Sequence, residues 1–421
     1  MRISRSAARR SNKLPRSGLK MKRYGNPDYV LYAAAVVATL FGVIAVWDAG
    51  YAEAAAMGQM LPRSVITQGL YGIAGLVGAW GISQVAPSRI RQIAVPGMII
   101  ISLLLVGVLF LGKEINGATR WYRFGPFSFQ PSEVAKVFCI ISTAAGFAGL
   151  TPWVKPKWRN SRQWIGHVLI PKIQRAWPLL PVLVVVGLIE MQPDLKTACV
   201  ILVTAGFMLW AAGVSRKSFA LLGVCAVVLA GAAIVDKPYR LTRLLSHSDR
   251  WSENKIDSIG FQTTQSETAL AMGGVMGKGF GEGRAKYTLP EPTNDFILAT
   301  IGEELGLFGS LLVIGLLGFI TWRIYSQGMM RVDRFERLTM VGVSVWIGVQ
   351  TVTNVVVTNG AVPVMGVPLP FFSSGGTSLF ALWLGIGVVQ AVVSSPNVVV
   401  EEGQSRESEG RAVRNRAAYV K

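Results

Sequence analysis

The sequence predicts an all-α, polytopic membrane protein with ten transmembrane helices. The 421 residues are 51% hydrophobic and only 15% charged, and the apolar residues form long unbroken runs instead of amphipathic periods. Because soluble domains usually carry about a quarter charged residues, the composition argues against an ordinary cytosolic enzyme. A net charge of +19 would also suit a nucleic-acid-binding protein, so the positions of the basic residues have to decide between these classes.

The apolar runs define the predicted helices. A helix crosses a bilayer with about 20 apolar residues, and runs of about 17 are tolerated. Ten segments qualify or nearly qualify: Tyr29–Asp48, Val65–Val85, Ile93–Leu111, Pro131–Leu150, Trp177–Met191, Leu195–Gly213, Ser218–Val235, Phe296–Tyr325, Leu338–Val357 and Thr377–Val393. The first run is long enough to span, which predicts a membrane helix and not a cleaved signal.

The basic residues predict the orientation of these helices. With ten spans both termini lie on the same side, and 28 of the 42 Lys and Arg residues fall in segments on that side. The positive-inside rule therefore places both termini in the cytoplasm. Most of the basic residues therefore serve to orient the protein in the membrane, and we expect no nucleic-acid partner.

The chain divides into three predicted parts. Residues 1–28 form a basic cytoplasmic tail, residues 29–395 a membrane domain, and residues 396–421 a second tail of disordered composition. Within the membrane domain, the segment 236–294 is a 59-residue, Gly-rich and charged outer loop. The three cysteines lie in apolar runs and the two histidines are too few for a His-based metal site, so we expect no bound metal cluster.

Ionisable residues at membrane depth are costly and usually functional. Glu133 and Lys136 lie three residues apart on one helix face and can pair, either as a structural ion pair or as the lining of an outward polar cavity. Asp194 and Lys196 crowd the turn between the fifth and sixth spans, where Lys196 is expected to pair with Asp194 or Glu190. Asp295, Glu303 and Glu304 open the eighth span.

Two further segments offer anion-binding chemistry. Arg120 and Trp121 precede the fourth span, either as interfacial anchors or with the Arg120 guanidinium directed at a phosphate. The run from Pro368 to Thr377 opens the tenth span, either as a helix start that binds an anion or as a re-entrant packing turn.

Taken together, the motifs between Tyr29 and Val393 resemble the SEDS family of cell-wall proteins, which includes FtsW, RodA and SpoVE. The motifs that carry the resemblance occur in the family's order: Gly117-Ala-Thr-Arg-Trp121, Phe129-Gln-Pro-Ser-Glu133-Val-Ala-Lys136, Gln192-Pro-Asp194-Leu, Gln262-Thr-Thr-Gln265-Ser266, Gly273-Gly-Val-Met-Gly277-Lys-Gly279, Leu289-Pro-Glu291, Asp295-Phe-Ile, Gly302-Glu-Glu304-Leu-Gly306 and Pro363-Val-Met-Gly-Val-Pro368-Leu-Pro370-Phe. Each motif is weak alone, but the ordered series is specific.

This resemblance implies a glycosyltransferase that polymerises lipid II into glycan strands at the outer face of the bacterial cytoplasmic (inner) membrane. A carboxylate would accept the proton of the acceptor hydroxyl, and cations would neutralise the departing pyrophosphate. The implied substrate-binding residues are Arg120, Trp121, Gln130, Glu133, Lys136, Asp194, Lys196, Gln265, Ser266, Lys286, Asp295, Ser373 and Ser374. No cofactor is implied with certainty, although a divalent cation is compatible with this chemistry.

The outer loop departs from the family's catalytic pattern, Asp-Pro-Trp-x-Asp-Pro followed by Gly-x-Gly-Tyr-Gln. Alignment on Asp249-Arg-Trp251 places Glu253 at the catalytic position, whereas alignment on Gly260-Phe-Gln262 places Lys255 there, with Asp257 two residues away. An inactive or rearranged site is the remaining alternative. The family also has glycine where this chain has Lys196, and tyrosine where it has Ser374.

The resemblance favours the division-associated FtsW branch over the elongation-associated RodA branch. It implies a class B penicillin-binding protein as the partner transpeptidase, together with other divisome or elongasome proteins. Two other functions remain open: a lipid II transporter that uses the same intramembrane charges, and a non-catalytic scaffold that activates the transpeptidase.

Overall fold

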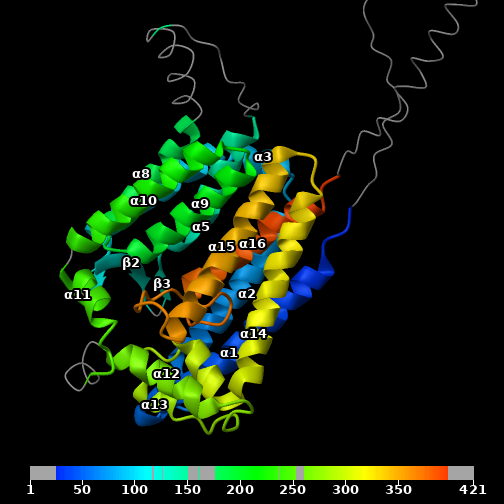
Figure 1. Ribbon diagram of the computed structural model, residues 1–421. Coiled ribbons are helices and arrows are strands. Elements are labelled where there is room, and N and C mark those ends of the chain that lie inside the picture. The colour runs from blue at the N-terminus through cyan, green and yellow to red at the C-terminus, as the bar shows by residue number, and fades with distance from the viewer. Residues whose placement is uncertain are drawn as a thin grey trace, which may run out of the picture.

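The computed structural model describes residues 25–115, 118–125, 127–149, 160, 176–236, 238–252 and 260–396. In these ranges the chain is mainly helical, and its long helices run side by side in one bundle (Figure 1). The helices are α1 (Tyr29–Ala56), α2 (Arg63–Ser83), α3 (Pro87–Gln92), α4 (Ala94–Leu111), α5 (Pro131–Ala148), α8 (Leu180–Met191), α9 (Leu195–Ala211), α10 (Arg216–Asp236), α11 (Pro238–Ser246), α12 (Phe261–Gly273), α13 (Ala285–Thr288), α14 (Ile297–Met329), α15 (Arg334–Thr358) and α16 (Gly376–Val393), and a short 3-10 helix, η2 (Trp177–Leu179), precedes α8.

A helix occupies each of the ten predicted segments, which confirms the all-α polytopic fold. Six helices in the described ranges are long and apolar enough to cross a membrane, namely α1, α2, α4, α14, α15 and α16. Two shorter apolar helices cover Trp177–Met191 and Leu195–Ala211. The total of ten spans stays a prediction.

Two helices continue at least four residues beyond their predicted ends. Helix α1 ends at Ala56 and not at Asp48, and α14 ends at Met329 and not at Tyr325. The extra residues of α1 are rich in alanine, the strongest helix former. The apolar run therefore marks where a helix can lie in lipid, whereas helix propensity decides how far it continues.

A small antiparallel sheet joins α4 to α5, in addition to the predicted helices. Its strands are β1 (Lys113–Ile115), β2 (Ala118–Phe124) and β3 (Phe127–Phe129), in the order β1-β2-β3. The turn from β2 to β3 contains Gly125 with φ of +60°, a conformation that favours glycine. The Tyr122 hydroxyl donates to the carbonyl of Leu104 at 2.9 Å and the Tyr71 hydroxyl to that of Ser128 at 2.6 Å, so the sheet is fixed to α4 and α2.

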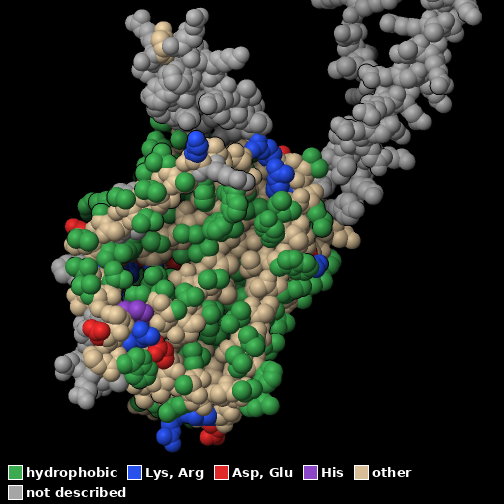
Figure 2. All heavy atoms as spheres, in the orientation of Figure 1, with side chains coloured by type: hydrophobic (Ala, Val, Ile, Leu, Met, Phe, Trp, Pro, Cys, Tyr) green, Lys and Arg blue, Asp and Glu red, His purple; other side chains and the backbone are tan. Residues whose placement is uncertain are grey.

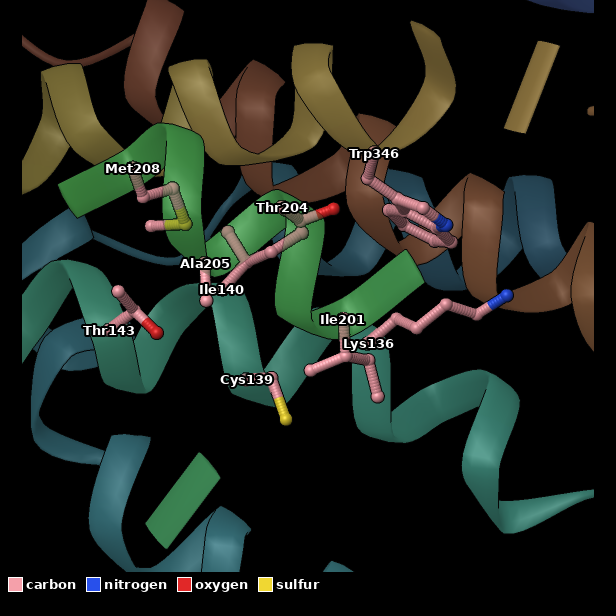
Figure 3. A pocket seen from close by; sticks show the side chains of 9 residues that line it. All are labelled: Lys136, Cys139, Ile140, Thr143, Ile201, Thr204, Ala205, Met208 and Trp346. Carbon is pink, nitrogen blue, oxygen red and sulfur yellow. The ribbon is translucent and has the colours of Figure 1, made fainter. Parts of the chain in front are cut away.

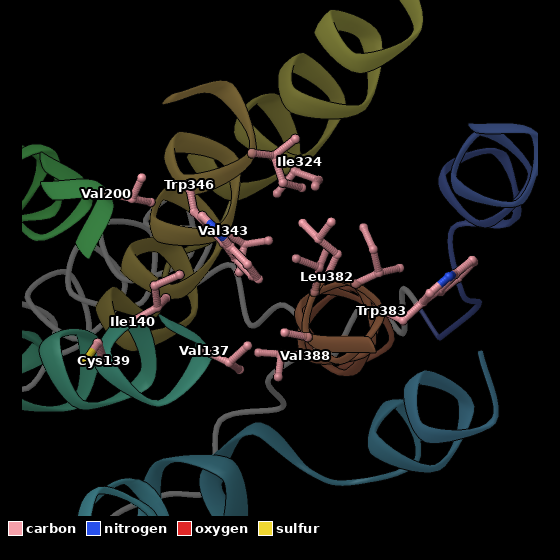
Figure 4. Close-up of a cluster of buried hydrophobic side chains, with 14 of the residues drawn as sticks. Val137, Cys139, Ile140, Val200, Ile324, Val343, Trp346, Leu382, Trp383 and Val388 are labelled. Atoms are coloured by element: carbon pink, nitrogen blue, oxygen red, sulfur yellow. The ribbon is translucent and has the colours of Figure 1, made fainter. Parts of the chain in front are cut away.

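The core of the bundle is built around α16. Figure 4 shows side chains of α5, α9, α14 and α15 converging near it, with Trp346 and Trp383 fully buried. Small residues allow α2 to approach α16 closely, since a Cβ atom added at Gly75 would lie 2.8 Å from Cβ of Trp383. Close approach of this kind is how helices gain dispersion energy in lipid, where the hydrophobic effect contributes little.

The outer surface of the bundle is apolar along its length. Large hydrophobic side chains are exposed on several helices, for example Val37, Ile73, Ile99 and Leu311. In Figure 2 green side chains cover the middle of this face, and the blue and red side chains lie mainly toward its two ends. This distribution fits a multi-pass membrane protein.

The two ends of the described chain meet at one end of the bundle. The Asp28 carboxylate caps α1 and accepts from Arg323 Nε at 2.6 Å and Nη2 at 2.9 Å, and its backbone amide donates to Gln390 Oε1 at 2.8 Å. Gln390 returns a hydrogen bond to the Asp28 carbonyl at 2.9 Å. The first helix is thereby joined to α14 and α16 at the end opposite α12 and α13 (Figure 1).

Candidate functional site

Most predicted site residues lie toward the end of the bundle that carries the sheet and helices α11 to α13. They form several separate clusters, each built around one charged side chain. The two predicted catalytic carboxylates, Glu253 and Asp257, lie outside the described residues, which stop at Ser252 and resume at Gly260.

The first cluster surrounds Asp194, a fully buried residue that caps the start of α9. Its carboxylate accepts from the Thr197 hydroxyl at 2.9 Å and amide at 3.4 Å, from Gln130 Nε2 at 3.1 Å and from the Ser132 hydroxyl at 3.4 Å. Asp194 therefore joins α9 to the start of α5. It makes no ion pair with Lys196 in the described structure.

Arg120 supports the same turn from strand β2. Its Nε donates to the carbonyl of Gln192 at 2.8 Å, and its Nη2 donates to that of Pro193. The guanidinium carbon lies 6.0 Å from the centre of the Trp121 ring. Two nitrogen atoms of the guanidinium that was predicted to bind phosphate therefore already hold the α8–α9 turn.

Lys196 corrects a prediction. Its ammonium donates to the carbonyl of Gly366 and lies near Asp295, whereas Glu190 pairs with Arg240 at 2.5 Å. The expected pairing with Asp194 or Glu190 is therefore wrong. The first turn of α9 directs Lys196 across the bundle toward the loop before α16, while Asp194 faces its own helix as the cap.

Asp295 provides a pH-dependent prediction. Burial raises the pKa of its carboxyl, and the nearby Lys196 opposes that rise. Because the pKa in the folded protein is above its unfolded value, the ionised form weakens the fold at high pH, and this cost fades as the carboxyl becomes protonated. Asp295→Asn should therefore raise the melting temperature at about pH 7.5, and the gain should shrink toward about pH 4.

Thermal unfolding of the detergent-solubilised protein measures this effect. The exposed Glu282 gives the matched control, since Glu282→Gln removes the same charge and should change little at either pH. A variant at Asp295 that melts below the wild type at the higher pH would contradict the prediction.

Glu133 and Lys136 form the predicted ion pair, with 2.8 Å between Lys136 Nζ and Glu133 Oε2. Both side chains are buried, and the ammonium lies 5.3 Å from the centre of the Trp346 ring. Figure 3 shows Lys136 and Trp346 at one side of a small cavity of about 10 Å³ between α5, α9 and α15. Thr143, Thr204 and the Trp346 indole nitrogen have no hydrogen-bond partner among the described residues, but the surface that lines this cavity is almost entirely apolar.

Lys286 is the centre of a buried charge triad. Its ammonium lies 2.8 Å from Asp48 Oδ1 and 3.0 Å from Glu304 Oε1, and it donates to the Gly281 carbonyl at 2.7 Å. Burial alone would lower the pKa of Lys286, but the hydrogen bonds to the two carboxylates outweigh it and raise the pKa. The chain therefore uses this predicted pyrophosphate ligand to join α13 to α1 and α14.

The Gly-rich loop between α12 and α13 encloses this triad. Helix α14 is kinked at Gly306, where φ is +67°. The kink leaves carbonyls of the preceding turn without partners inside the helix. The loop supplies hydrogen-bond donors for these carbonyls. The amides of Lys278 and Gly279 donate to the carbonyls of Glu303 and Glu304, each at 3.0 Å.

The remaining predicted residues are placed by backbone contacts. The Ser373 hydroxyl donates to the Asn294 carbonyl at 2.6 Å, and the Ser374 amide donates to the Thr293 carbonyl at 2.8 Å. The buried Ser266 hydroxyl donates to the Thr358 carbonyl at 2.7 Å. Gln265 is half-buried on α12, and no hydrogen bond of its side chain involves a described residue.

The sequence did not identify Asp48 or Arg240 as members of these clusters, and it placed Glu190 beside Lys196 and not beside Arg240. Asp48 and Glu190 are carboxylates at the ends of apolar runs, and their depth could have indicated a buried cation as partner. The described residues contain no group of three or more His, Cys, Asp or Glu side chains that could hold a metal ion.

Comparison with known proteins agrees with this architecture. A family model described as "Cell cycle protein", which covers FtsW, RodA and SpoVE, matches residues 29–397. The probable peptidoglycan glycosyltransferase FtsW of Trichlorobacter lovleyi is 31% identical over 371 residues, 87% of this chain and 93% of that protein. The probable peptidoglycan glycosyltransferase FtsW of Saccharophagus degradans is 33% identical over 361 residues, 84% of this chain and 88% of that protein.

Solved structures give the same result. A chain from a peptidoglycan synthase complex that coordinates polymerization and crosslinking has a TM-score of 0.68 at 28% identity, over 87% of this chain and 97% of that chain. The rod shape determining protein RodA of Thermus thermophilus has a TM-score of 0.61 at 26% identity, over 87% of this chain and 96% of its own. The chain therefore belongs to the FtsW/RodA/SpoVE family of membrane-embedded cell cycle proteins, as its motifs predicted.

Proposed function

We propose that this protein is a peptidoglycan glycosyltransferase that polymerises lipid II into glycan strands at the outer face of the bacterial cytoplasmic membrane during division. The observation that carries the proposal is the family relationship, because relatives named peptidoglycan glycosyltransferase FtsW align with 84% or more of the chain. The excess of basic residues on the side of the termini supports cytoplasmic ends. The charged clusters at the opposite end would then face outward.

In the proposed reaction the acceptor sugar hydroxyl attacks the anomeric carbon of the lipid-linked donor. A new glycosidic bond forms, the bond to the diphosphate breaks, and undecaprenyl diphosphate leaves with both electrons of that bond. A carboxylate of the outer loop, Glu253 or Asp257, accepts the hydroxyl proton. Since Glu and Asp have similar intrinsic acidity, either can serve as the base.

A class B penicillin-binding protein is the proposed partner. The structural relative comes from a peptidoglycan synthase complex that coordinates polymerization and crosslinking. A transpeptidase bound in the same membrane would receive the new strand directly.

Polymerisation by purified full-length protein with this partner tests the proposal. We expect polymer from lipid II with the wild type, and a loss of about 100-fold or more in Glu253→Ala or Asp257→Ala, whichever removes the base. Lys217, exposed at the start of α10, gives the control Lys217→Ala, which should retain full activity. A parallel reaction with chelator tests for a divalent cation.

Other outcomes point to other functions. Wild type that makes no polymer with a competent partner would indicate a scaffold. Lipid II translocation in vesicles that survives loss of both carboxylates, without polymer, would indicate a transporter. Full polymerisation by both carboxylate variants would refute the general-base assignment alone.

A further inference from the structure

The segment that carries the two candidate bases is flanked on both sides by described residues. Glu253 follows Trp251 by two positions, and Asp257 precedes Gly260, the N-cap of α12, by three. Because consecutive Cα atoms are about 3.8 Å apart, the covalent chain alone keeps Glu253 within about 8 Å of Trp251 and Asp257 within about 11 Å of Gly260. The groups that fix these two flanks therefore limit where a base can lie.

A hydrogen-bonded turn directly precedes this segment. The Ser252 amide donates to the Asp249 carbonyl at 2.9 Å, which places Arg250 at the second position of the turn. Arg250 is not among the described residues with positive φ, so proline, which is favoured at this position, would fit its backbone. The SEDS pattern Asp-Pro-Trp has proline here when it is aligned on Asp249 and Trp251. This chain lacks the ring that would fix the turn, so another contact has to restrain it.

Glu267, in the middle of α12, supplies that contact. Its Oε1 accepts from Arg250 Nε at 2.8 Å and lies 2.7 Å from Nη2, and its Oε2 accepts from Trp251 Nε1 at 2.8 Å. Because the side chains of Arg250 and Glu267 are only 20% and 18% exposed, solvent screens this ion pair less than a fully exposed one. Arg250, Trp251 and Glu267 thus form a clamp between the turn and α12, which lies at the same end of the bundle as α11 (Figure 1).

The end of α15 fixes the helix side of the clamp. Gly360 has φ of +69°, and a Cβ atom added there would overlap the Glu267 carboxylate. The residue before Glu267 in α12 is Ser266, whose hydroxyl donates to the Thr358 carbonyl at 2.7 Å. Glu267 therefore projects from a part of α12 that is attached to α15.

We propose that Glu267 positions the general base of the glycosyl transfer, because it fixes the turn from which the base-carrying segment starts. This role rests on the proposed function. The clamp joins positions 17 residues apart, so the segment between Ser252 and Gly260 starts and ends at α12, and closing a loop in this way removes conformational freedom. Arg250 and Trp251 engage both oxygens of Glu267, so it acts through them and is a positioning residue.

The physical reason for such a residue is the short reach of proton transfer. A general base has to lie within about 2.6–3.2 Å of the proton donor, and a misplacement of about 1 Å can cost about 100-fold in rate. A base on a segment with a loose flank would seldom reach this geometry. The clamp takes over in this chain the restraint that proline provides in the family pattern.

Polymerisation of lipid II by the full-length protein with its transpeptidase partner tests this role. A glutamine amide cannot accept from both Arg250 and Trp251. We therefore expect Glu267→Gln to lower kcat about tenfold or more, with KM for lipid II changed less than about twofold. Arg250→Pro in the Glu267→Gln background should restore most of kcat, because proline fixes the turn without the carboxylate.

Two comparisons separate positioning from a general effect on the fold. Glu282→Gln removes an exposed carboxylate outside the clamp and should keep full activity. In the Glu253→Ala or Asp257→Ala variant that lacks the base, Glu267→Gln should cause no further loss, since groups that act as one unit are not additive. Wild-type kcat in Glu267→Gln, or a loss that multiplies with that of the base variant, would overturn the proposal.

Hydrogen exchange of residues 248–252 tests the clamp without catalysis. Glu267→Gln should speed exchange of the Ser252 amide, which donates within the turn, whereas Glu282→Gln should not. Unchanged exchange in Glu267→Gln would overturn the proposal whether or not polymer is made. Failure of the proposed function looks different, because the wild type would then make no polymer while Glu267→Gln still speeds exchange in the turn.

Discussion

Replacing Lys286 by methionine should destabilise the protein by about 3–5 kcal/mol, because it leaves two buried carboxylates without their cation. The side chains of Lys286, Asp48 and Glu304 are 2%, 9% and 3% exposed. Water therefore cannot compensate for the lost ammonium. Tryptophan fluorescence during thermal unfolding in detergent should show a melting temperature lower by several degrees.

A second substitution separates lost charge compensation from lost packing. In Lys286→Met with Glu304→Gln, one of the two uncompensated carboxylates is neutral, so part of the stability should return. The comparison variant Lys278→Met removes the 2.6 Å pair with Glu303, in which the lysine side chain is 31% exposed, and should cost less. A Lys286→Met protein as stable as wild type would mean that the triad contributes nothing to the fold.

Gly277→Ala should also strongly destabilise the fold, for two reasons that can be separated. The backbone of Gly277 has φ of +78°, which L side chains rarely adopt, and an added Cβ would lie 2.1 Å from the Glu304 carbonyl oxygen and 2.7 Å from the Gly306 amide nitrogen. Backbone atoms cannot rotate away, so the loop would have to separate from the kink of α14. We expect a loss of several kcal/mol, well above the roughly 1 kcal/mol usual for a point mutation.

Gly281 provides a matched control in the same loop. Its φ is +85°, but a Cβ there would meet nothing within 4 Å. Gly281→Ala therefore carries the backbone strain of about 1–3 kcal/mol without the clash. Equal melting temperatures for the two alanine variants would show that the contact with α14 is unimportant.

The helical architecture could be predicted because it depends on short-range properties of the chain. Unbroken apolar runs located the helices, and the three-residue spacing of Glu133 and Lys136 predicted their ion pair correctly. The tyrosine and tryptophan residues of β2 favour strands. Its partners β1 and β3 have only three residues each, which is too short to stand out beside two apolar runs. The sheet was therefore missed.

The partners of the remaining charges could not be predicted because they depend on which helices meet. Lys286 pairs with Asp48, 238 residues earlier in the chain, and no local spacing reports that contact. Lys196 has two carboxylates close in sequence, yet Asp194 is occupied as a helix cap and Glu190 by Arg240. Proximity along the chain favoured the wrong partner, since the helix cap directs the Asp194 carboxylate toward its own helix.

The contact of Asp28 with Gln390 constrains the order in which the molecule can be completed. Asp28 belongs to the earliest described residues and Gln390 lies in α16, the last described helix, 362 positions later. During synthesis α1 enters the membrane long before its final polar partners exist, and the Asp28 amide cannot acquire its side-chain acceptor until translation reaches α16. The contact between Asp28 and α16 can therefore form only after α16 has been made. A chain that stops before α16 would leave α1 without this attachment.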